Sequence, residues 1–287
     1  MNKQTLELQD GRKLSYCVRG NPEGKTVLLL HGSPGHAVYW YRLPGVSEAL
    51  ETFRFVSVDR RGYGESDYLK GTTYLNYVDD IRQLLDHLRT ERAVVLAASG
   101  GGPFALACAY RMAARVEQVV LASGAGPSRV RQVEEGLSST SRVVYRVARR
   151  LPWLMKLNMR FLARWQNRDP LGYLDKMSYK LAEADKAVLQ QTDAQEILKD
   201  VYTNSTANSW RGYAQDVVLQ ANHWGFDPGD IRTKVAIIQA NDDTSVPPAV
   251  GEYFAQVIPD STLHIFSNAG HLWHLVNMKE VLSTIDV

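Results

Sequence analysis

The chain has few of the features that mark secreted, membrane-spanning or metal-binding proteins. Its 287 residues include only two cysteines, Cys17 and Cys108, which are too few for a disulfide scaffold and lack the spacing of metal ligands. We interpret both as small buried side chains. No run approaches about 18 consecutive apolar residues, which excludes an obvious transmembrane helix and stable membrane insertion. No pattern calls for a metal or another cofactor.

Charge and leader-like features are also scarce. The formal net charge is +2, which is too small to indicate a nucleic-acid partner. The first residues lack the apolar stretch of a secretory signal, so we expect a cytoplasmic protein. The apolar content of 45% and the length suit one large domain or one domain with a sizeable insertion. The sequence leaves the oligomeric state open.

Alternating strand-like and helix-like segments are what the chain does contain. Apolar residues recur at spacings of three and four between Leu75 and Leu88, which indicates an amphipathic helix. We predict an α/β protein with β-α-β units around a mostly parallel sheet and an antiparallel start. Several strand-like runs are nearly continuous Val, Ile and Leu, as in strands covered on both faces. The predicted strands are 14–18, 26–30, 53–58, 93–97, 116–122, 235–240 and 262–266.

One interval interrupts this alternation. Residues 128–223 contain no convincing strand, and their helix-like segments cover 136–150, 153–165, 171–186 and 192–202. No low-complexity linker separates this interval from its surroundings. We therefore predict a helical cap at 128–223 that docks on a core made of 1–127 and 224–287.

Ser99 lies where a predicted strand passes into a predicted helix. The apolar run that ends at Leu96 precedes it, and a helical stretch begins at Phe104. The positions two before and two after the serine are Ala97 and Gly101, both small enough for strand and helix to pass closely. A strand, a tight turn at serine and a helix are typical of a nucleophile elbow.

A glycine-rich turn follows another predicted central strand. His31-Gly32-Ser33-Pro34-Gly35 comes directly after 26–30, so it belongs at the carboxyl edge of the sheet, where active sites of such sheets form. The backbone N–H of Ser33, with that of Gly100, would form an oxyanion hole for a tetrahedral intermediate. A plain tight turn is the alternative interpretation of this motif.

Three aspartates follow strands and compete for the role of catalytic acid. Asp242 and Asp243 come after 235–240, and the spacing Asp243-x-x-Val246-Pro247 favours Asp243. A carboxylate here would accept the Nδ1 proton of a histidine. Asp59 precedes the serine in chain order, and we interpret it as a structural residue of a turn.

The candidate base follows the last predicted strand. Gly270 allows a sharp turn, and His271 would project toward Ser99 as general base and then general acid. We predict that His274 has a rim or packing role. The order serine, aspartate, histidine is that of α/β-hydrolases and differs from the chymotrypsin and subtilisin orders.

These motifs make the chain similar to the α/β-hydrolase superfamily over nearly its whole length. It resembles bacterial hydrolases with His-Gly-x-Pro-Gly, Asp-Arg-x-Gly-Tyr-Gly-x-Ser and Ser-Gly-Gly-Gly-Pro, found here at 31–35, 59–66 and 99–103. The resemblance implies an eight-stranded, mostly parallel sheet flanked by helices, with the cap inserted after strand 6. It implies the following roles: nucleophile Ser99, acid Asp243, base His271, and oxyanion donors at the N–H groups of Ser33 and Gly100.

The resemblance also bears on the substrate. A serine at the elbow argues against dehalogenases and epoxide hydrolases of this family, which use aspartate there. We expect hydrolysis of small to medium carboxylic esters or lactones through an acyl-enzyme. Proline iminopeptidases and carbon-carbon bond hydrolases remain alternatives, as does a hydrolase-derived ligand receptor. Ala97 departs from the glycine usual in the family, and we expect a slightly tighter elbow.

The predicted cap is unusually basic. Between residues 128 and 186 there are thirteen Lys or Arg and six Asp or Glu. Leucine, phenylalanine and tryptophan recur among these charges, so we expect an apolar underside over the pocket and a basic outer face. The apolar residues of this pattern are Leu154, Leu157, Phe161, Leu162 and Trp165. Candidates for the substrate pocket are His36, Trp165 and Trp273.

Overall fold

The structure, a computed structural model, describes residues 2–286, apart from the side chain of residue 180. One sheet of eight strands runs through the molecule in the order β1-β2-β4-β3-β5-β6-β7-β8. β2 is antiparallel to both β1 and β4, and the other neighbours are parallel, which confirms the predicted antiparallel start. The strands are β1 (Gln4–Glu7), β2 (Lys13–Gly20), β3 (Lys25–Leu30), β4 (Phe53–Val58), β5 (Ala93–Ala98), β6 (Val116–Ala122), β7 (Lys234–Ala240) and β8 (Ser261–Phe266).

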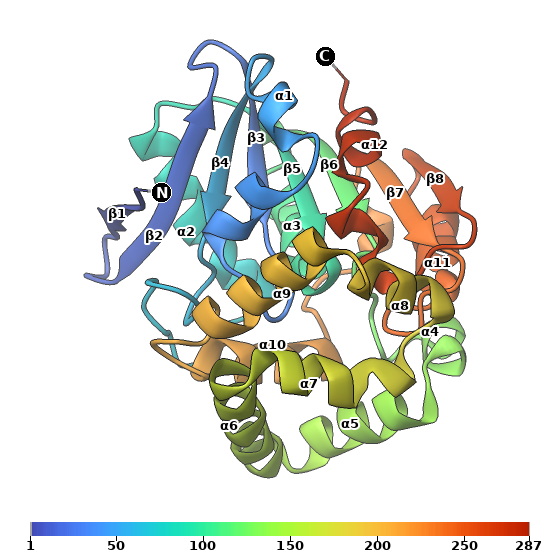
Figure 1. The fold of residues 1–287 in the computed structure, drawn as a ribbon. Coiled ribbons are helices and arrows are strands. Elements are labelled where there is room, and N and C mark those ends of the chain that lie inside the picture. The colour runs from blue at the N-terminus through green and yellow to red at the C-terminus, as the bar shows by residue number, and fades with distance from the viewer. Residues whose placement is uncertain (1, 287) are drawn as a thin grey trace.

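Helices cover both faces of this sheet (Figure 1). The α-helices outside the cap are α1 (Val46–Ala49), α2 (Tyr74–His87), α3 (Gly102–Arg111), α11 (Pro248–Val257) and α12 (Met278–Leu282). Side chains of α2, α3 and α11 pack on one face. The second face is covered by α12, by the short 3-10 helix η1 (Ala37–Arg42) and by part of the cap. The strands β3, β4, β5, β6 and β7 between these two layers are almost wholly buried, as their apolar sequences predicted.

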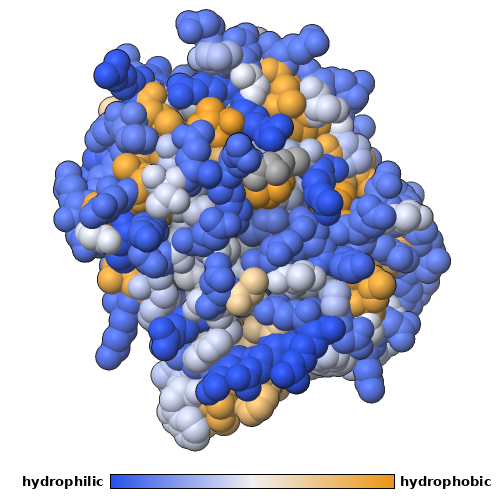
Figure 2. Space-filling model, turned by 60° about the vertical axis from the view of Figure 1, so that its left-hand side comes forward, coloured by the Kyte–Doolittle hydropathy of each residue, from blue (hydrophilic) through white to orange (hydrophobic). Residues whose placement is uncertain are grey.

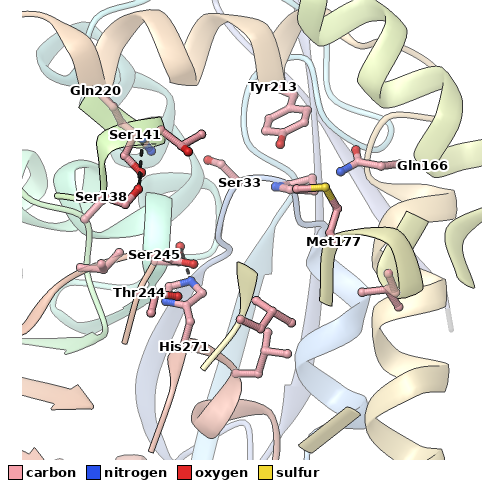
Figure 3. Close-up of a pocket in the computed structure, with 18 of the residues that line it drawn as sticks. Ser33, Ser138, Ser141, Gln166, Met177, Tyr213, Gln220, Thr244, Ser245 and His271 are labelled. Carbon is pink, nitrogen blue, oxygen red and sulfur yellow. Dashed lines mark hydrogen bonds between the residues drawn. The ribbon is translucent and has the colours of Figure 1, made fainter. Parts of the chain in front are cut away.

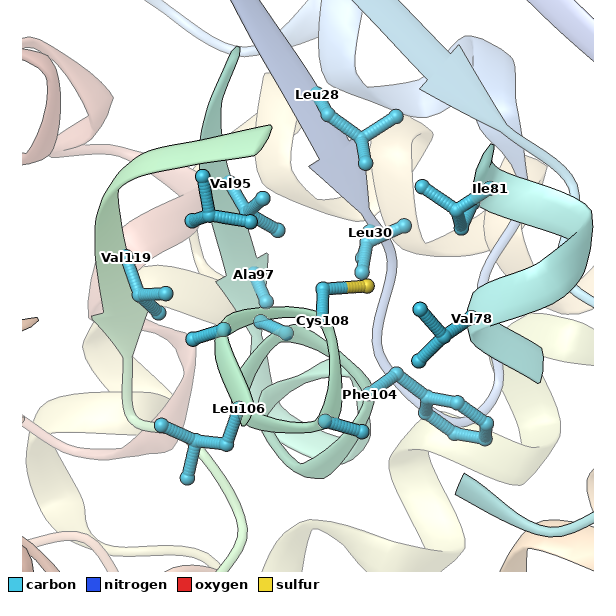
Figure 4. Close-up of a cluster of buried hydrophobic side chains, with 14 of the residues drawn as sticks. Leu28, Leu30, Val78, Ile81, Val95, Ala97, Phe104, Leu106, Cys108 and Val119 are labelled. Carbon is cyan, nitrogen blue, oxygen red and sulfur yellow. The ribbon is translucent and has the colours of Figure 1, made fainter. Parts of the chain in front are cut away.

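Packing around α3 fixes the turn that precedes it. Figure 4 shows Leu28, Leu30, Val95 and Ala97 of the central strands gathered on the side of the sheet that faces this helix. Cys108 is fully buried among them as a free thiol, and Cys17 is buried in β2, which confirms the predicted role of both cysteines. A helix clamped in this way against β3 and β5 gives the chain between β5 and α3 little freedom to move.

The cap follows β6, as predicted, and lies across the carboxyl ends of the central strands (Figure 1). The predicted helix over 171–186 is wrong, because the chain forms two α-helices there, separated by the 3-10 helix η4 (Ser178–Lys180) and by residues 181–182. α10 had no predicted counterpart. The cap helices are α4 (Arg131–Gly136), α5 (Ser139–Arg150), α6 (Pro152–Arg168), α7 (Pro170–Met177), α8 (Glu183–Leu189), α9 (Thr192–Asn204) and α10 (Arg211–Ala221).

The expected apolar underside of α6 is also wrong. The helix turns Met155, Met159 and Ala163 inward, where they pack with residues of α5 and α10. Four of the five residues expected to face inward are exposed instead, and only Leu162 packs against that cluster. The exposed four are Leu154, Leu157, Phe161 and Trp165. α6 thus has two apolar stripes, and the smaller side chains occupy the one that allows close helix packing.

Candidate active site

Ser99 sits on the predicted sharp turn. β5 ends at Ala98, a single 3-10 turn covers Ser99–Gly101, and α3 begins at Gly102. The φ angle of Ser99 is +48°, a strained value for a residue with a side chain. A Cβ atom on Gly101 would lie 2.7 Å from the carbonyl oxygen of His31, so only glycine fits at that position. The elbow therefore requires a small residue at position 101 because the carbonyl groups at the end of β3 leave no space for a side chain.

Hydrogen bonds join the three residues predicted as a triad. His271 Nε2 lies 3.0 Å from Ser99 Oγ, and His271 Nδ1 lies 2.8 Å from Asp243 Oδ2. The other Asp243 oxygen accepts the backbone N–H groups of Ser245 and Val246 at 2.9 and 2.8 Å. The neighbouring Asp242 is exposed. The structure thus places Asp243, and not Asp242, beside His271. Backbone N–H groups of the turn after β7 hold its carboxylate in position.

The charge around His271 favours its protonated form. Burial alone would lower its pKa, but the Asp243 carboxylate outweighs burial and, with Asp185, raises the pKa of His271 above its ordinary value of 6.5. His274 shows the opposite behaviour, because burial and the neighbouring His271 lower its pKa to about 4. His274 is buried against the backbone of His271, which confirms its predicted packing role.

Asp185 of the cap is a site residue that the sequence gave no reason to select. Its carboxylate accepts the backbone N–H of His271 at 2.9 Å and that of Leu272 at 2.6 Å. The residue is fully buried, and the carboxylate packs against Gly270, where a Cβ would overlap it. Burial raises the pKa of Asp185, and the two backbone donors partly offset this. A cap helix therefore holds the start of the loop that carries His271.

The glycine-rich turn lies against the elbow, as predicted. A Cβ on Gly32 would be 3.2 Å from the Ser99 Cβ, and the Ser33 side chain occupies the space beside Gly100. His31 is buried, which lowers its pKa well below the ordinary value, and its Nε2 accepts the backbone N–H of Arg60 at 3.0 Å. A neutral His31 thus links the turn to the backbone of Arg60 through this hydrogen bond.

A buried ion pair fixes the same turn to the cap, and the sequence did not indicate it. The Arg60 guanidinium donates to the carbonyl oxygens of His31 and Gly32 at 3.0 and 2.9 Å. It also donates to Asp216 of α10 at 2.7 Å, and the Ser33 hydroxyl donates to the same carboxylate. Both charged residues are buried. Each guanidinium and carboxylate is paired, as burial of charge requires.

Asp59 has the structural role predicted for it. Its carboxylate accepts the backbone N–H of Ala37 at 2.6 Å and that of Glu65 at 3.1 Å, and it pairs with Lys3 at 2.8 Å. These bonds tie together the segments that follow β3 and β4. The carboxylate is fully engaged in them and does not contact Ser99 or His271.

A cavity of about 540 Å³ opens above Ser99 and His271, between the core and the cap (Figure 3). Its lining is rich in hydroxyl and amide groups from α5 and its N-cap, α6 and α10, which include Ser138, Ser141, Gln166, Tyr213 and Gln220. Among the described residues that line it, none is Asp, Glu, Lys or Arg. A second cavity of about 100 Å³ also reaches Ser99 and His271 and is bordered by Tyr39, Leu198 and Val201.

The three side chains predicted for the pocket line neither cavity. His36 is buried, caps η1 and lies 3.1 Å from Asp200 of α9. Trp273 stacks on Phe266 and donates to the Ser123 hydroxyl at 2.9 Å. Trp165 is partly exposed on α6 and contacts Tyr173 edge-on. These predictions are wrong, because neighbouring groups enclose the rings of His36 and Trp273, and Trp165 lies on an exposed side of α6.

Comparison with known proteins agrees with this fold. The proline iminopeptidase PfmaB of Pestalotiopsis fici is 24% identical over 290 residues, which cover 96% of this chain and 95% of that protein. The esterase EaEST of Exiguobacterium antarcticum superposes with a TM-score of 0.74 at 20% identity, covering 98% of this chain and 96% of that one. The enol-lactonase of Burkholderia xenovorans superposes with a TM-score of 0.70 at 21% identity, covering 98% of this chain and 100% of that one.

The family assignment rests on a match over most of the chain. A model of the alpha/beta hydrolase fold family matches residues 25–277, which span the sheet from β3 onward, the cap and the loop of His271. Within residues 2–286, every helix is too short or too polar to cross a membrane. The fold, the position of the cap after β6 and this match lead to one conclusion: the chain belongs to the alpha/beta hydrolase fold family.

Proposed function

We propose that this protein is a serine hydrolase that cleaves neutral carboxylic esters or lactones through an acyl-enzyme intermediate. The observation that supports it most is the hydrogen-bonded row Ser99, His271 and Asp243 at the floor of a cavity whose described lining residues include no Asp, Glu, Lys or Arg. The cavity volume lies in the range usual for small-molecule sites.

In the first half-reaction, Ser99 Oγ attacks the substrate carbonyl carbon while its proton passes to His271 Nε2. The C=O electron pair moves onto the oxygen, which the N–H groups of Ser33 and Gly100 stabilise. When the intermediate collapses, the bond to the leaving oxygen breaks and His271 gives its proton to that oxygen. Asp243 keeps Nδ1 protonated and stabilises the transient imidazolium.

In the second half-reaction, water replaces the alcohol. His271 takes a proton from the water, whose oxygen attacks the acyl carbon, and the resulting intermediate collapses with return of that proton to Ser99 Oγ. The product is the free acid. The two cavities that meet at Ser99 suit the two sides of an ester, with the bulkier group in the larger one.

The uncharged lining favours this substrate class over both alternatives. An aminopeptidase must bind the ammonium group of its substrate, and a ring-cleavage product carries a carboxylate. A buried charge needs a partner of opposite sign, and the described lining residues provide neither a carboxylate nor a Lys or Arg. A neutral ester needs only the hydroxyl and amide groups that are present.

Turnover by the purified protein tests the proposal. We expect hydrolysis of p-nitrophenyl esters or of simple lactones, and loss of this activity in Ser99→Ala. The same panel should include proline β-naphthylamide and a ring-cleavage product. A preference for the proline amide would favour the peptidase, and binding of the panel without Ser99-dependent turnover would favour a receptor.

A further inference from the structure

The most unusual surface of the molecule is the outward face of α6. Trp153 is 66% exposed, Phe161 62% and Leu157 41%, and they recur every fourth residue along the helix. Leu154 and Trp165 extend the same face. A soluble helix normally turns such side chains toward the core, but the inward face of α6 is already filled by Met155, Met159 and Ala163.

Positive charge is interleaved with these apolar side chains. Arg160, Arg164 and Arg168 are exposed and lie on the same side of the helix at 100° per residue. No described residue forms an ion pair with any of the three. α6 contains no acidic residue, and the carboxylate of the following Asp169 is used to cap α7. Figure 2 shows strongly hydrophilic and hydrophobic side chains side by side at this end of the molecule.

We name these eight residues the α6 face: Trp153, Leu154, Leu157, Arg160, Phe161, Arg164, Trp165 and Arg168. We propose that the α6 face docks the protein reversibly on an anionic lipid surface. Tryptophan, phenylalanine and leucine would enter the boundary between headgroups and acyl chains, and the arginines would extend to the lipid phosphates and carboxylates. The helix would lie in the plane of the interface and would not cross it.

Charge complementarity favours an anionic lipid surface over a second copy of the chain as the partner of the α6 face. Two copies paired through the α6 face would bring their arginines together, with no acidic side chain on α6 to offset them. An anionic surface attracts all three arginines at once, and each arginine should increase the affinity for that surface about fivefold. A nucleic acid would also attract the arginines, but it offers no apolar phase for Leu157 and Phe161.

Vesicle co-sedimentation tests this docking. We expect the full chain to bind vesicles of equimolar phosphatidylcholine and phosphatidylserine, to lose most of this binding in high salt, and to bind pure phosphatidylcholine poorly. Replacing Arg160, Arg164 and Arg168 together by Gln should weaken binding by roughly a hundredfold. Trp153→Ala with Phe161→Ala should also weaken it by roughly a hundredfold or more, because the apolar area of two large aromatic side chains is lost.

Matched controls keep the test specific. Lys70, Arg89 and Arg92 are exposed basic residues of the core, and their replacement by Gln removes the same charge without touching the α6 face. We expect this control to bind like the native protein, as should Ser99→Ala, since docking needs no turnover. Circular dichroism and thermal unfolding should show all variants folded, because every substituted side chain on α6 is exposed.

Several outcomes would overturn the proposal. Equal binding to neutral and anionic vesicles would show that the arginines play no part. Absence of binding in low salt would exclude lipid as the occupant. A dimer that Phe161→Ala dissociates, without vesicle binding, would assign the α6 face to a subunit contact. Tight binding of a DNA or RNA oligomer, lost in the arginine variant, would assign it to nucleic acid.

Discussion

The core and the cap each place a buried carboxylate on the same histidine residue. Asp243 of the core binds the imidazole of His271, whereas Asp185 of the cap binds the backbone at the start of its loop. The two carboxylates therefore have different roles. The first contacts the imidazole that moves a proton in the proposed mechanism, and the second contacts the backbone that positions this imidazole.

The same division recurs on the other side of Ser99. The core provides the turn with Ser33 and the guanidinium of Arg60 that supports it. The cap provides Asp216, which completes the ion pair. In both places the core contributes the groups that contact the substrate in the proposed mechanism, and the cap contributes a buried carboxylate that holds them. Removal of a core group should therefore abolish the chemistry, and removal of a cap group should weaken it.

The largest effect should come from Ser99→Ala or His271→Ala. Each should lower kcat on the order of 10⁶-fold on a preferred ester, because nucleophile and base act as one unit. The double variant should be no slower than either single one. Steady-state kinetics with thermal unfolding checks this, and a double variant much slower than both would show that they act separately.

Asp243→Asn should have a smaller but still large effect. We expect a loss of about 10⁴-fold in kcat, because Asn cannot stabilise the imidazolium or hold the required tautomer. The matched control is Asp242→Asn, whose side chain is exposed and should leave kcat nearly unchanged. A larger effect at Asp242 than at Asp243 would contradict the hydrogen bonding seen here.

The difference between core and cap also explains what the sequence predicted. Near-continuous apolar runs mark the central strands, and Ser99 and Asp243 each follow such a strand in a turn of small or polar residues. His271 follows the edge strand β8, whose sequence mixes polar and apolar residues, and Gly270 marks the turn before it. Those signals are local, so Ser99, Asp243 and His271 could be selected from sequence alone. β1 lacks such a signal, because three of its four residues are polar at an exposed edge.

The cap contributions are not local and could not be selected in this way. Asp185 lies on a short helix among other charged residues, and Asp216 lies on a helix of mixed polar and apolar sequence. An aspartate in either context is usually exposed. Their partners are 86 and 156 positions away in the chain. The inward face of α6 was mispredicted for a related reason: its periodicity fits two stripes, and packing against α5 and α10 decides between them.

Asp216→Asn should lower the stability of the protein more strongly than it lowers kcat. The change leaves the buried Arg60 guanidinium without its anionic partner, which should lower the free energy of unfolding by about 3 kcal/mol. Urea denaturation measures this. Asp175→Asn, an exposed carboxylate of α7, is the control and should change stability by less than about 0.5 kcal/mol. An unchanged midpoint for Asp216→Asn would show that the pair is not needed.

The smallest effect, and the one that separates positioning from catalysis, should come from Asp185→Asn. One amide oxygen replaces two carboxylate oxygens, so one backbone N–H of the His271 loop loses its acceptor. We expect kcat to fall roughly tenfold with KM nearly unchanged, because the loop shifts while the cavity is kept. Glu183→Gln, on the same helix but exposed, should behave like the native protein.

The pH profile of Asp185→Asn gives a second readout. His271 must be neutral to act as base, so activity is lost as pH falls through its pKa, which lies above the ordinary value of 6.5 in the native protein. The Asp185 charge is one of the groups that raise it. Its removal lowers the pKa of His271, so the acid limb of kcat/KM should move to lower pH in this variant and stay in place in Glu183→Gln. A tenfold loss without movement of the limb would mean that Asp185 acts on the loop backbone alone, and that the proton affinity of His271 is set within the core.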